Sequence, residues 1–254
     1  MSISIDDIRK NLSDSWIKLI EETKFPKDSK PLGTMLFDES ISPYWTKILA
    51  RINQDISRKV KIFPSINLWF DGINQTPLDR FRVVILGQDP YPNEKDACGI
   101  AFATKTGNAT ASLRNVEKEI KRTYGAEVEM DYSLKNWIDQ GVMLLNTALT
   151  IPSNSDEKTN HRDIGWNEFI YELLNAIFTN FNVVLITFGG VARSVYTKFK
   201  GVYPKANPIS WINVVHPSPR ASISAKFPFV GSNVFKECNK TLIENDLLPI
   251  RWFK

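Results

Sequence analysis

Four short apolar runs restrict this chain to few folds: FRVVILG (81–87), GVMLLN (141–146), NVVLITFG (182–189) and WINVVH (211–216). They are rich in β-branched residues and do not alternate with polar ones, which is typical of strands covered on both faces. Segments with helical periodicity lie between them. This order predicts an α/β fold, a three-layer sandwich in which helices flank a central four-stranded parallel sheet.

Four helices are expected around this sheet, over residues 4–22, 111–125, 162–178 and 232–245. Ser112 is the expected N-cap of the second helix, Gly125 its stop, and Ser232 the start of the last. We find no internal repeat and no linker, and 254 residues with 43% apolar content can build a large core. The chain is therefore interpreted as a single domain, with about residues 1–42 as an N-terminal helical extension that has no assigned role.

Polar side chains or glycines follow each apolar run. The first run leads into Gln88 and Asp89, the second ends on Asn146, the third continues into Gly189 and Gly190, and the fourth ends on His216. In open parallel sheets the ligand crevice lies beyond the carboxyl ends of the strands. We therefore expect a carboxylate, an imidazole and amides to meet in one pocket.

Charge is distributed unevenly along the sequence. No acidic residue occurs between Glu172 and Glu237, although the whole chain has a net charge of only +4. The basic residues of this segment are Arg193, Lys198, Lys200, Lys205, Arg220, Lys226 and Lys236. A basic field of this kind is expected of a protein that binds a polyanion. A solvated face whose acidic partners lie elsewhere in the sequence is the alternative.

Several protein classes are not favoured by the composition. Cys98 and Cys238 lie far apart and the chain has two histidines, so we expect free thiols, no structural metal and no disulfide. No apolar window reaches the ~18 residues of a membrane span, and the first residues lack the pattern of a secretion signal. The expected location is intracellular, in the cytoplasm or in a nucleus or viral factory depending on the host.

The ordered motifs of the chain resemble those of family 1 uracil-DNA glycosylases. They are VVILGQDPY, CGIAFAT, SLRNVEKEI, GVMLLNTALT, HRDIGW, VVHPSPR and FVGSNVFKECNKTLIENDLLPIRW, between about Ile62 and Trp252. The resemblance implies a hydrolase of base-excision repair that flips uracil out of DNA, cleaves its N-glycosidic bond and leaves an abasic site. It also implies the four-stranded fold expected above and a reaction that requires no metal or cofactor.

The resemblance assigns four residues to uracil binding. Phe102 matches the aromatic residue that stacks on uracil, and Tyr91 the ring that excludes the methyl group of thymine. Asn146 would present one donor and one acceptor to the edge of uracil, and a polar pocket rejects a mismatched edge strongly. Gln88 would contribute mainly its backbone N–H to a uracil carbonyl.

The same resemblance assigns two further residues to the reaction and a third to the surroundings of the pocket. Bond cleavage makes the sugar cationic and uracil anionic. Asp89 matches the carboxylate that orients the attacking water and favours the sugar cation. His216 matches a neutral imidazole that donates to uracil O2. His161 matches a second histidine, in the hydrogen-bond network behind the pocket.

DNA contacts are implied for Ser112 and Ser218, which match serines that donate to phosphates on either side of the lesion. Pro92 stands where the family usually has histidine, and TGNATAS before Ser112 replaces a proline-rich loop. Arg220 replaces a leucine that enters the base stack; a guanidinium can also stack or reach a phosphate. Pro92 and Arg220 together resemble the poxvirus-like branch of the family.

Alternatives exist for each residue and for the function. Taken singly, Asp89 could form a turn before a proline, and Phe102 could be a core residue. Asn146 could hold a loop by hydrogen bonds, and His216 could be a turn residue. A second hypothesis is a DNA-binding or polymerase processivity subunit whose glycosylase activity is incidental. A third is a glycosylase for mismatched or damaged bases, against which Tyr91 and Asn146 argue. The expected partners are uracil-containing DNA, single- or double-stranded, a replication or processivity protein, and a DNA-mimic inhibitor protein; no membrane partner is expected.

Overall fold

The computed structural model describes residues 2–25, 35–154, 156, 159–223 and 225–254. Four of its strands form a parallel sheet in the order β3-β2-β5-β6, with the bounds Val142–Asn146, Val83–Gly87, Val184–Phe188 and Ser210–Val214. A small antiparallel pair, β1 (Ile62–Phe63) with β4 (Ile151–Pro152), lies outside this sheet. The predicted α/β class and the four-stranded parallel sheet are confirmed, whereas the β1–β4 pair was not predicted.

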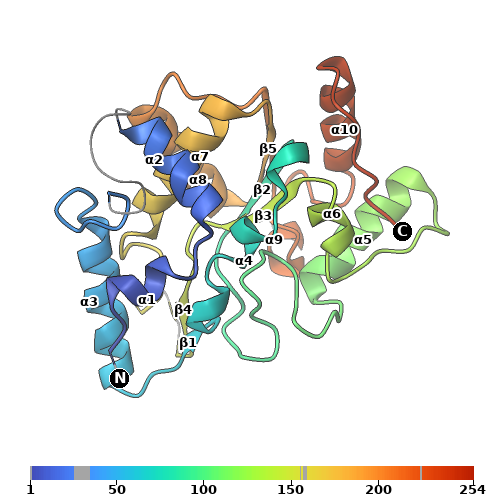
Figure 1. The fold of residues 1–254 in the computed structure, drawn as a ribbon. Helices are drawn as coiled ribbons and strands as arrows, with labels where there is room; N and C mark the ends of the chain where they lie inside the picture. The colour runs from blue at the N-terminus through green and yellow to red at the C-terminus, as the bar shows by residue number, and fades with distance from the viewer. Residues whose placement is uncertain (1, 26–34, 155, 157–158, 224) are drawn as a thin grey trace.

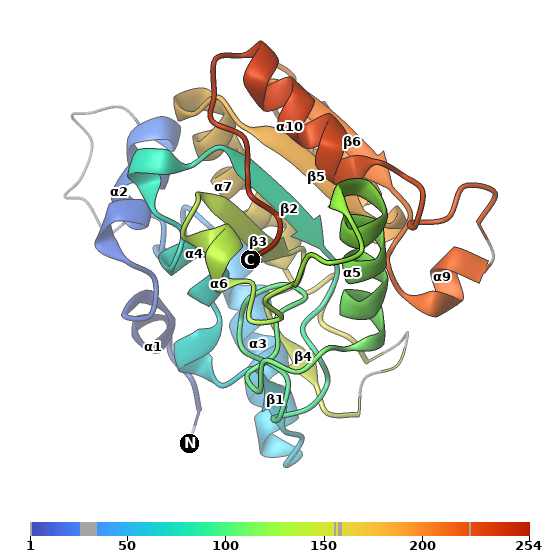
Figure 2. The same ribbon diagram turned by 90° about the vertical axis from the view of Figure 1, so that its right-hand side faces the viewer.

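Helices cover both faces of the sheet (Figures 1 and 2). One face carries α2 (Asp14–Lys24), α3 (Tyr44–Ser57), α7 (Trp166–Asn180) and α8 (Gly190–Val202). The other carries α5 (Ala111–Tyr124), α6 (Lys135–Ile138) and α10 (Val234–Glu244). Short elements complete the described fold: α1 (Ile5–Arg9), α4 (Asp71–Asn74), α9 (Pro219–Ile223) and the 3-10 turns η1 (Ile66–Leu68) and η2 (Leu78–Arg80).

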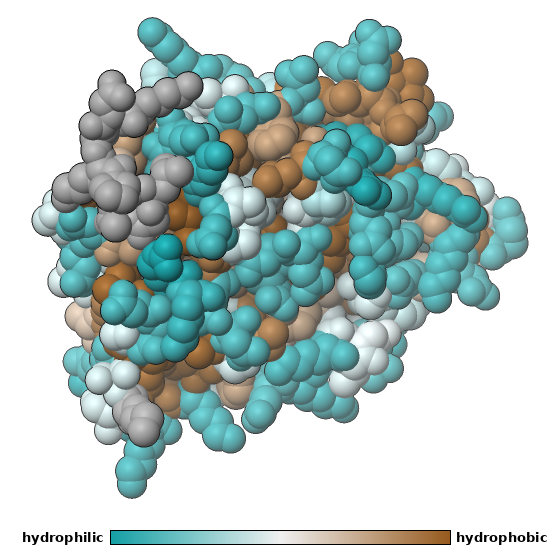
Figure 3. Space-filling view, viewed as in Figure 1, coloured by the Kyte–Doolittle hydropathy of each residue, from teal (hydrophilic) through white to brown (hydrophobic). Residues whose placement is uncertain are grey.

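The two-sided cover explains why β2, β3 and β5 consist almost entirely of apolar residues. Successive side chains of a strand point to opposite faces. Val84 and Leu86 belong to the apolar cluster beneath α2, α3, α7 and α8, and Val83 and Ile85 belong to the cluster beneath α5, α6 and α10. The edge strand β6 is less covered, and its burial alternates along the strand. Most of the face seen in Figure 3 is hydrophilic, with an apolar area over α10.

The N-terminal segment packs against the main body. Ile8, Trp16 and Ile20 are buried in the same cluster as β2 and α7. The single helix expected over residues 4–22 is wrong, because the chain bends between α1 and α2. Asn74 holds this bend: its amide accepts from Ser13 N–H and donates to the Asn11 carbonyl. The interpretation as a single domain with an N-terminal extension stays a prediction.

Other helix starts also differ from expectation. Thr110, not Ser112, is the N-cap of α5, with its Oγ1 accepting from Leu113 N–H; Gly125 ends the helix as expected. α7 begins at Trp166 because Gly165, at a φ of 125°, interrupts the helix that was expected from residue 162. α10 begins at Val234 after Asn233, which has a φ of 57°. No helix among the described residues is long and apolar enough to cross a membrane.

Candidate active site

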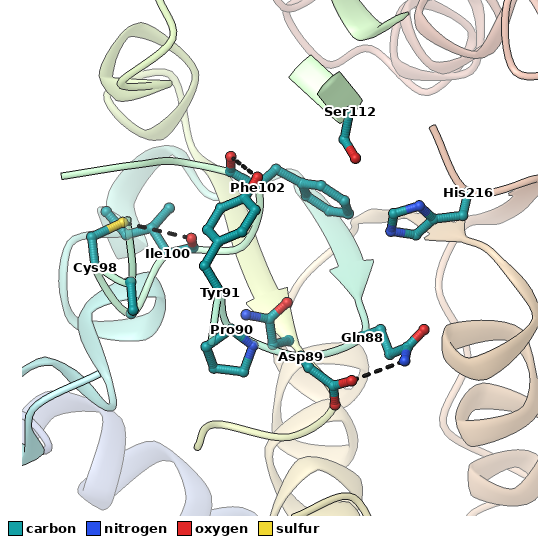
Figure 4. A pocket seen from close by; sticks show the side chains of 12 residues that line it. Gln88, Asp89, Pro90, Tyr91, Cys98, Ile100, Phe102, Ser112 and His216 are labelled. Atoms are coloured by element: carbon teal, nitrogen blue, oxygen red, sulfur yellow. Dashed lines mark hydrogen bonds between the residues drawn. The ribbon is translucent and has the colours of Figure 1, made fainter. Parts of the chain in front are cut away.

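The carboxyl ends of the strands place the predicted residues around one cavity. Gly87 pairs in register with Asn146, so Gln88 and Asp89 leave the sheet beside Asn146. His216 lies two residues beyond β6. The cavity has a volume of about 220 Å³ and is lined by Gln88, Asp89, Pro90, Tyr91, Ala97, Cys98, Gly99, Ile100, Phe102, Ser112, Asn146 and His216 (Figure 4).

Phe102 and Asn146 form a tightly packed wall of the cavity. A Cβ atom on Gly87 would lie 2.8 Å from Asn146 Oδ1 and 3.0 Å from the Phe102 ring, so a side chain there would displace one of these two groups. Phe102 has a φ of 68°, a left-handed conformation that costs a non-glycine residue about 1–3 kcal/mol. Asn146 is 6% exposed, and its amide makes no hydrogen bond within the described residues. This amide is therefore available to a ligand.

Tyr91 is fixed beside Phe102 by its hydroxyl. The hydroxyl lies 3.0 Å from the Phe102 carbonyl, to which it donates, and 3.0 Å from Thr110 Oγ1. Burial raises the pKa of Tyr91, so the phenol stays protonated at neutral pH. The contact with Thr110 ties the ring to the start of α5. The ring position is thus determined by two segments of the chain.

Asp89 accepts hydrogen bonds from two side chains. Gln88 Nε2 donates to Asp89 Oδ2 over 2.8 Å (Figure 4). Arg162 donates to the same oxygen from Nε over 2.8 Å and from Nη2 over 2.5 Å, and its Nε lies 3.2 Å from Oδ1. Arg162 was not predicted from the sequence, although it directly follows His161 in the HRDIGW motif. Its contact with Asp89 spans 73 residues, so no local pattern could have revealed it.

His216 is held in a defined tautomer. The backbone N–H of Ser218 donates to His216 Nδ1 over 3.0 Å, so Nδ1 acts as an acceptor and the neutral ring carries its proton on Nε2. Burial lowers the pKa of His216, with the Asp89 carboxylate opposing the shift, and this favours the neutral ring. The ring lies 5.7 Å from that of Phe102. The site therefore contains an N–H donor without a full positive charge.

His161 does not line the cavity. Its ring is fully buried, with Nδ1 2.9 Å from Thr150 Oγ1 and Nε2 2.9 Å from Asp55 Oδ2. An ionised carboxylate only accepts, so the neutral ring donates from Nε2 to Asp55, and Nδ1 accepts from the Thr150 hydroxyl, whose oxygen accepts in turn from Trp166 Nε1. Burial lowers the pKa of His161. The neutral ring thus fastens the segment before α7 to α3.

The predicted DNA contacts lie at the rim of the site or outside it; the rim denotes Ser112 together with the surface of the two further cavities described next. Ser112 lines the main cavity, and Ser218 and Arg220 line a second one of about 560 Å³ that shares Gln88 and His216 with the first. Pro92 is exposed and lines neither. The basic segment is only partly gathered here: besides Arg220, Arg193 and Lys226 line a third cavity of about 640 Å³.

The thiols and metal ligands can be placed in the same way. Cys98 and Cys238 are both free, Cys98 half-buried at the cavity and Cys238 buried in the core. Burial raises the pKa of both thiols, so neither is a reactive thiolate at neutral pH. No group of three His, Cys, Asp or Glu side chains suited to a metal ion occurs in the part of the chain that is described.

The fold and the site define a class of protein: an α/β protein with a polar, aromatic-walled cavity at the strand ends. The family model of the Uracil DNA glycosylase superfamily matches residues 73–243. A protein of Francisella tularensis named uracil-DNA glycosylase is 36% identical over 221 residues, which cover 86% of this chain and 96% of the relative. One of Pseudomonas syringae with the same name is 34% identical over 85% of this chain and 91% of its own length. The chain belongs to the uracil-DNA glycosylase superfamily.

Solved structures agree on the fold. The crystal structure of mimivirus uracil-DNA glycosylase superposes with a TM-score of 0.73 at 22% identity, covering 96% of this chain and 88% of that one. A variant of the mimivirus protein in complex with UGI also gives a TM-score of 0.73, at 21% identity over 99% of this chain and 91% of that one. At this identity the likeness supports the four-stranded α/β fold alone.

Proposed function

We propose that the 220 Å³ cavity holds a uracil flipped out of DNA and that Asp89 and His216 promote cleavage of its N-glycosidic bond. The chain is a glycosylase that removes uracil from DNA and thereby begins base-excision repair, in accord with its family and the names of its relatives. The observation that carries the residue-level proposal is the convergence of four separate segments, which bring Asp89, Phe102, Asn146 and His216 to one cavity.

Recognition of uracil is assigned to the cavity wall. An enzyme that acts on a base must extract it from the stack, at a cost of a few kcal/mol, and then hold it. Phe102 provides the stacking face, and the free amide of Asn146 provides a donor and an acceptor for the edge of the base. Tyr91, fixed by its hydroxyl, blocks the space that the methyl group of thymine would need. The Gln88 carbonyl is already occupied by Ala148 N–H and the Thr147 hydroxyl, which fixes the backbone that offers the Gln88 N–H.

The reaction makes the sugar cationic and the base anionic, and one residue is proposed to stabilise each of them. Water attacks C1′ of the deoxyribose while the bond from C1′ to N1 of uracil breaks, the bonding electron pair leaves with the base, and the proton released by the water passes to the Asp89 carboxylate. Asp89 orients the water and stabilises the cationic sugar. His216 donates from Nε2 to uracil O2 as negative charge develops there, which its tautomer permits. A neutral imidazole is suited to this task because the Nε2 proton stays on the ring.

DNA binding is assigned to the rim. Ser112 and Ser218 would donate to phosphates, and Arg220 would stack on or beside the bases left by the flipped nucleotide. Pro92, on the exposed surface near Tyr91, would contact the backbone without a charge. The exposed cations Arg193 and Lys226 support this assignment, because phosphate contacts supply much of the affinity for DNA.

Further partners and the subfamily are also proposals. Pro92 and Arg220 support placement in the poxvirus-like branch, whereas the curated relatives described above are bacterial. A DNA-mimic inhibitor would bind the same rim, since the solved mimivirus variant is in complex with UGI. An intracellular location follows from DNA as the substrate. The alternative of a processivity subunit with incidental activity is not favoured, because the relatives carry the enzyme's name; co-purification with a polymerase would support a replication partner.

The decisive test uses a single-stranded oligonucleotide with one uracil. The protein is incubated with it in the presence of a chelator, and the product is treated with hot alkali. Strand breaks at the uracil position are expected, with none in an otherwise identical oligonucleotide that has thymine there. Intact uracil oligonucleotide after incubation with well-folded protein would contradict the proposed function.

A further inference from the structure

We propose that Arg162 is a positioning residue for the reaction: its guanidinium group fixes the Asp89 carboxylate so that one oxygen is held and the other is presented to the attacking water. This inference rests on the proposed role of Asp89. It concerns a residue that lies 73 positions away in the chain and does not line the cavity.

The contact has the geometry of a fork. Arg162 donates from Nε and Nη2 to Asp89 Oδ2, at 2.8 and 2.5 Å, with Nε also 3.2 Å from Oδ1. The Asp89 side chain is 10% exposed and that of Arg162 is 33% exposed. Two N–H groups from one rigid plane restrain both the position and the rotation of a carboxylate, which a point charge cannot do.

Arg162 is itself held by the segment that carries it. Its backbone N–H donates to Asn160 Oδ1, and its carbonyl accepts from Asn167 Nδ2. The preceding residue, His161, is anchored to Thr150 and Asp55 as described above. Arg51 binds Asp55 and also donates to the Thr159 carbonyl. Arg162 therefore belongs to a segment that is hydrogen-bonded to both α3 and α7, and its guanidinium is in position before substrate binds.

The hydrogen bonds on Asp89 are distributed unevenly between its two oxygens. Oδ2 accepts from Gln88 Nε2 and from both Arg162 donors, whereas within the described residues Oδ1 has only the longer contact with Arg162. An ionised carboxylate has about four acceptor sites. Oδ2 is thus saturated, and Oδ1 retains the capacity to accept a hydrogen bond from water. Displacement of a catalytic group by about 1 Å can cost roughly 100-fold in rate.

Arg162→Gln and Arg162→Lys test this role in single-turnover cleavage of the uracil oligonucleotide. We expect Arg162→Gln to lower the cleavage rate about 10- to 100-fold while the Kd for a thymine oligonucleotide changes by less than about 3-fold. Arg162→Lys should fall between it and the wild type, since it keeps the charge and loses the fork. Arg58→Gln, which removes an exposed arginine after α3, is the matched control and should behave as wild type.

A double-mutant cycle separates positioning from other roles. If Arg162 acts through Asp89, Arg162→Gln should change the residual rate by less than about 2-fold in an Asp89→Asn background. An equal rate loss in both backgrounds, or a loss of affinity in both, would show a direct phosphate contact and overturn the proposal. An Arg162→Gln enzyme that cleaves faster than wild type would show that the contact with Arg162 inhibits Asp89, and it would also overturn the proposal.

The outcomes distinguish this inference from the proposed function. Wild-type protein that fails to cleave contradicts the function itself. Wild-type cleavage that is abolished by Asp89→Asn but unaffected by Arg162→Gln contradicts only the positioning role. Circular dichroism and thermal unfolding of each variant establish that the rates refer to folded protein.

Discussion

Asn146 and the side chain of Asp89, at the inner end of the site, are 6% and 10% exposed. By contrast, Ile223 at the end of α9 and Phe227, which lines the 640 Å³ cavity, are 86% and 77% exposed. The inner groups are fixed by the sheet register, by Gly87 and by hydrogen bonds from distant segments. α9 contributes Arg220 to the rim and the segment after it contributes Lys226 and Phe227, and large apolar side chains of this part of the chain face solvent. If the proposed roles hold, the catalytic groups are preorganised, and we expect DNA to complete the contacts of the rim.

This comparison predicts that inner substitutions alter the rate and rim substitutions alter binding. The largest effect is expected for Asp89→Asn, which should lower single-turnover cleavage by roughly 1,000-fold because the sugar cation loses its counter-charge. Affinity for undamaged DNA should change little. Rate and anisotropy measurements on the same preparation check both statements. Loss of DNA binding with the rate would place Asp89 among the binding groups and remove the distinction.

The next effect is expected at His216. His216→Leu removes the Nε2 donor and should slow cleavage by roughly 100-fold, with undamaged-DNA affinity within about 3-fold. Because burial lowers the pKa of His216, the ring of the free enzyme is neutral at and above pH 6.5. The difference between wild type and variant should therefore be constant from pH 6.5 to 8. A difference that vanishes across this range would contradict a neutral donor.

A smaller effect is expected on the free energy of unfolding, which should depend on pH through His161. The folded state holds His161 with a lowered pKa, so below about pH 6.5 the unfolded chain binds a proton that the folded chain does not. Above that pH, His161 should not reduce the free energy of unfolding. Below it, the free energy of unfolding should fall with acidification by at most about 1.4 kcal/mol per pH unit for this group. Urea unfolding at pH 7.5, 6.5 and 5.5 measures it. His161→Gln should reduce the loss between pH 6.5 and 5.5, and parallel curves would refute the assignment.

The smallest effect is expected at the rim. Lys226→Gln should weaken binding to undamaged DNA only a few-fold at low salt and reduce the slope of log affinity against log salt by about 1. The cleavage rate at saturating enzyme should stay within about 2-fold of wild type. Lys198→Gln, on an exposed part of α8, serves as a charge-matched comparison. Identical slopes for wild type and Lys226→Gln would remove Lys226 from the DNA interface.

The sheet and the strand-end residues could be predicted because parallel strands share one edge. The run that ends at Gly87 and the run that ends at Asn146 are in register, which brings Asp89 and Asn146 together without further information. The positions of the helix starts required tertiary contacts. By residue type Ser112 is a somewhat better N-cap than Thr110, but the Tyr91 hydroxyl contacts Thr110, and α5 begins there. The same limit applies to Arg162, whose partner is distant in the chain.

The hydrogen bond that sets the tautomer of His216 comes from the main chain, and this affects how the site tolerates change. Ser218 stands between Pro217 and Pro219, neither of which has an N–H, so it contributes the sole amide hydrogen of that tripeptide. A substitution at position 218 leaves this amide intact unless the new residue is proline. The serine hydroxyl, which accepts from Ala221 N–H, can therefore be exchanged without altering which nitrogen of His216 carries the proton.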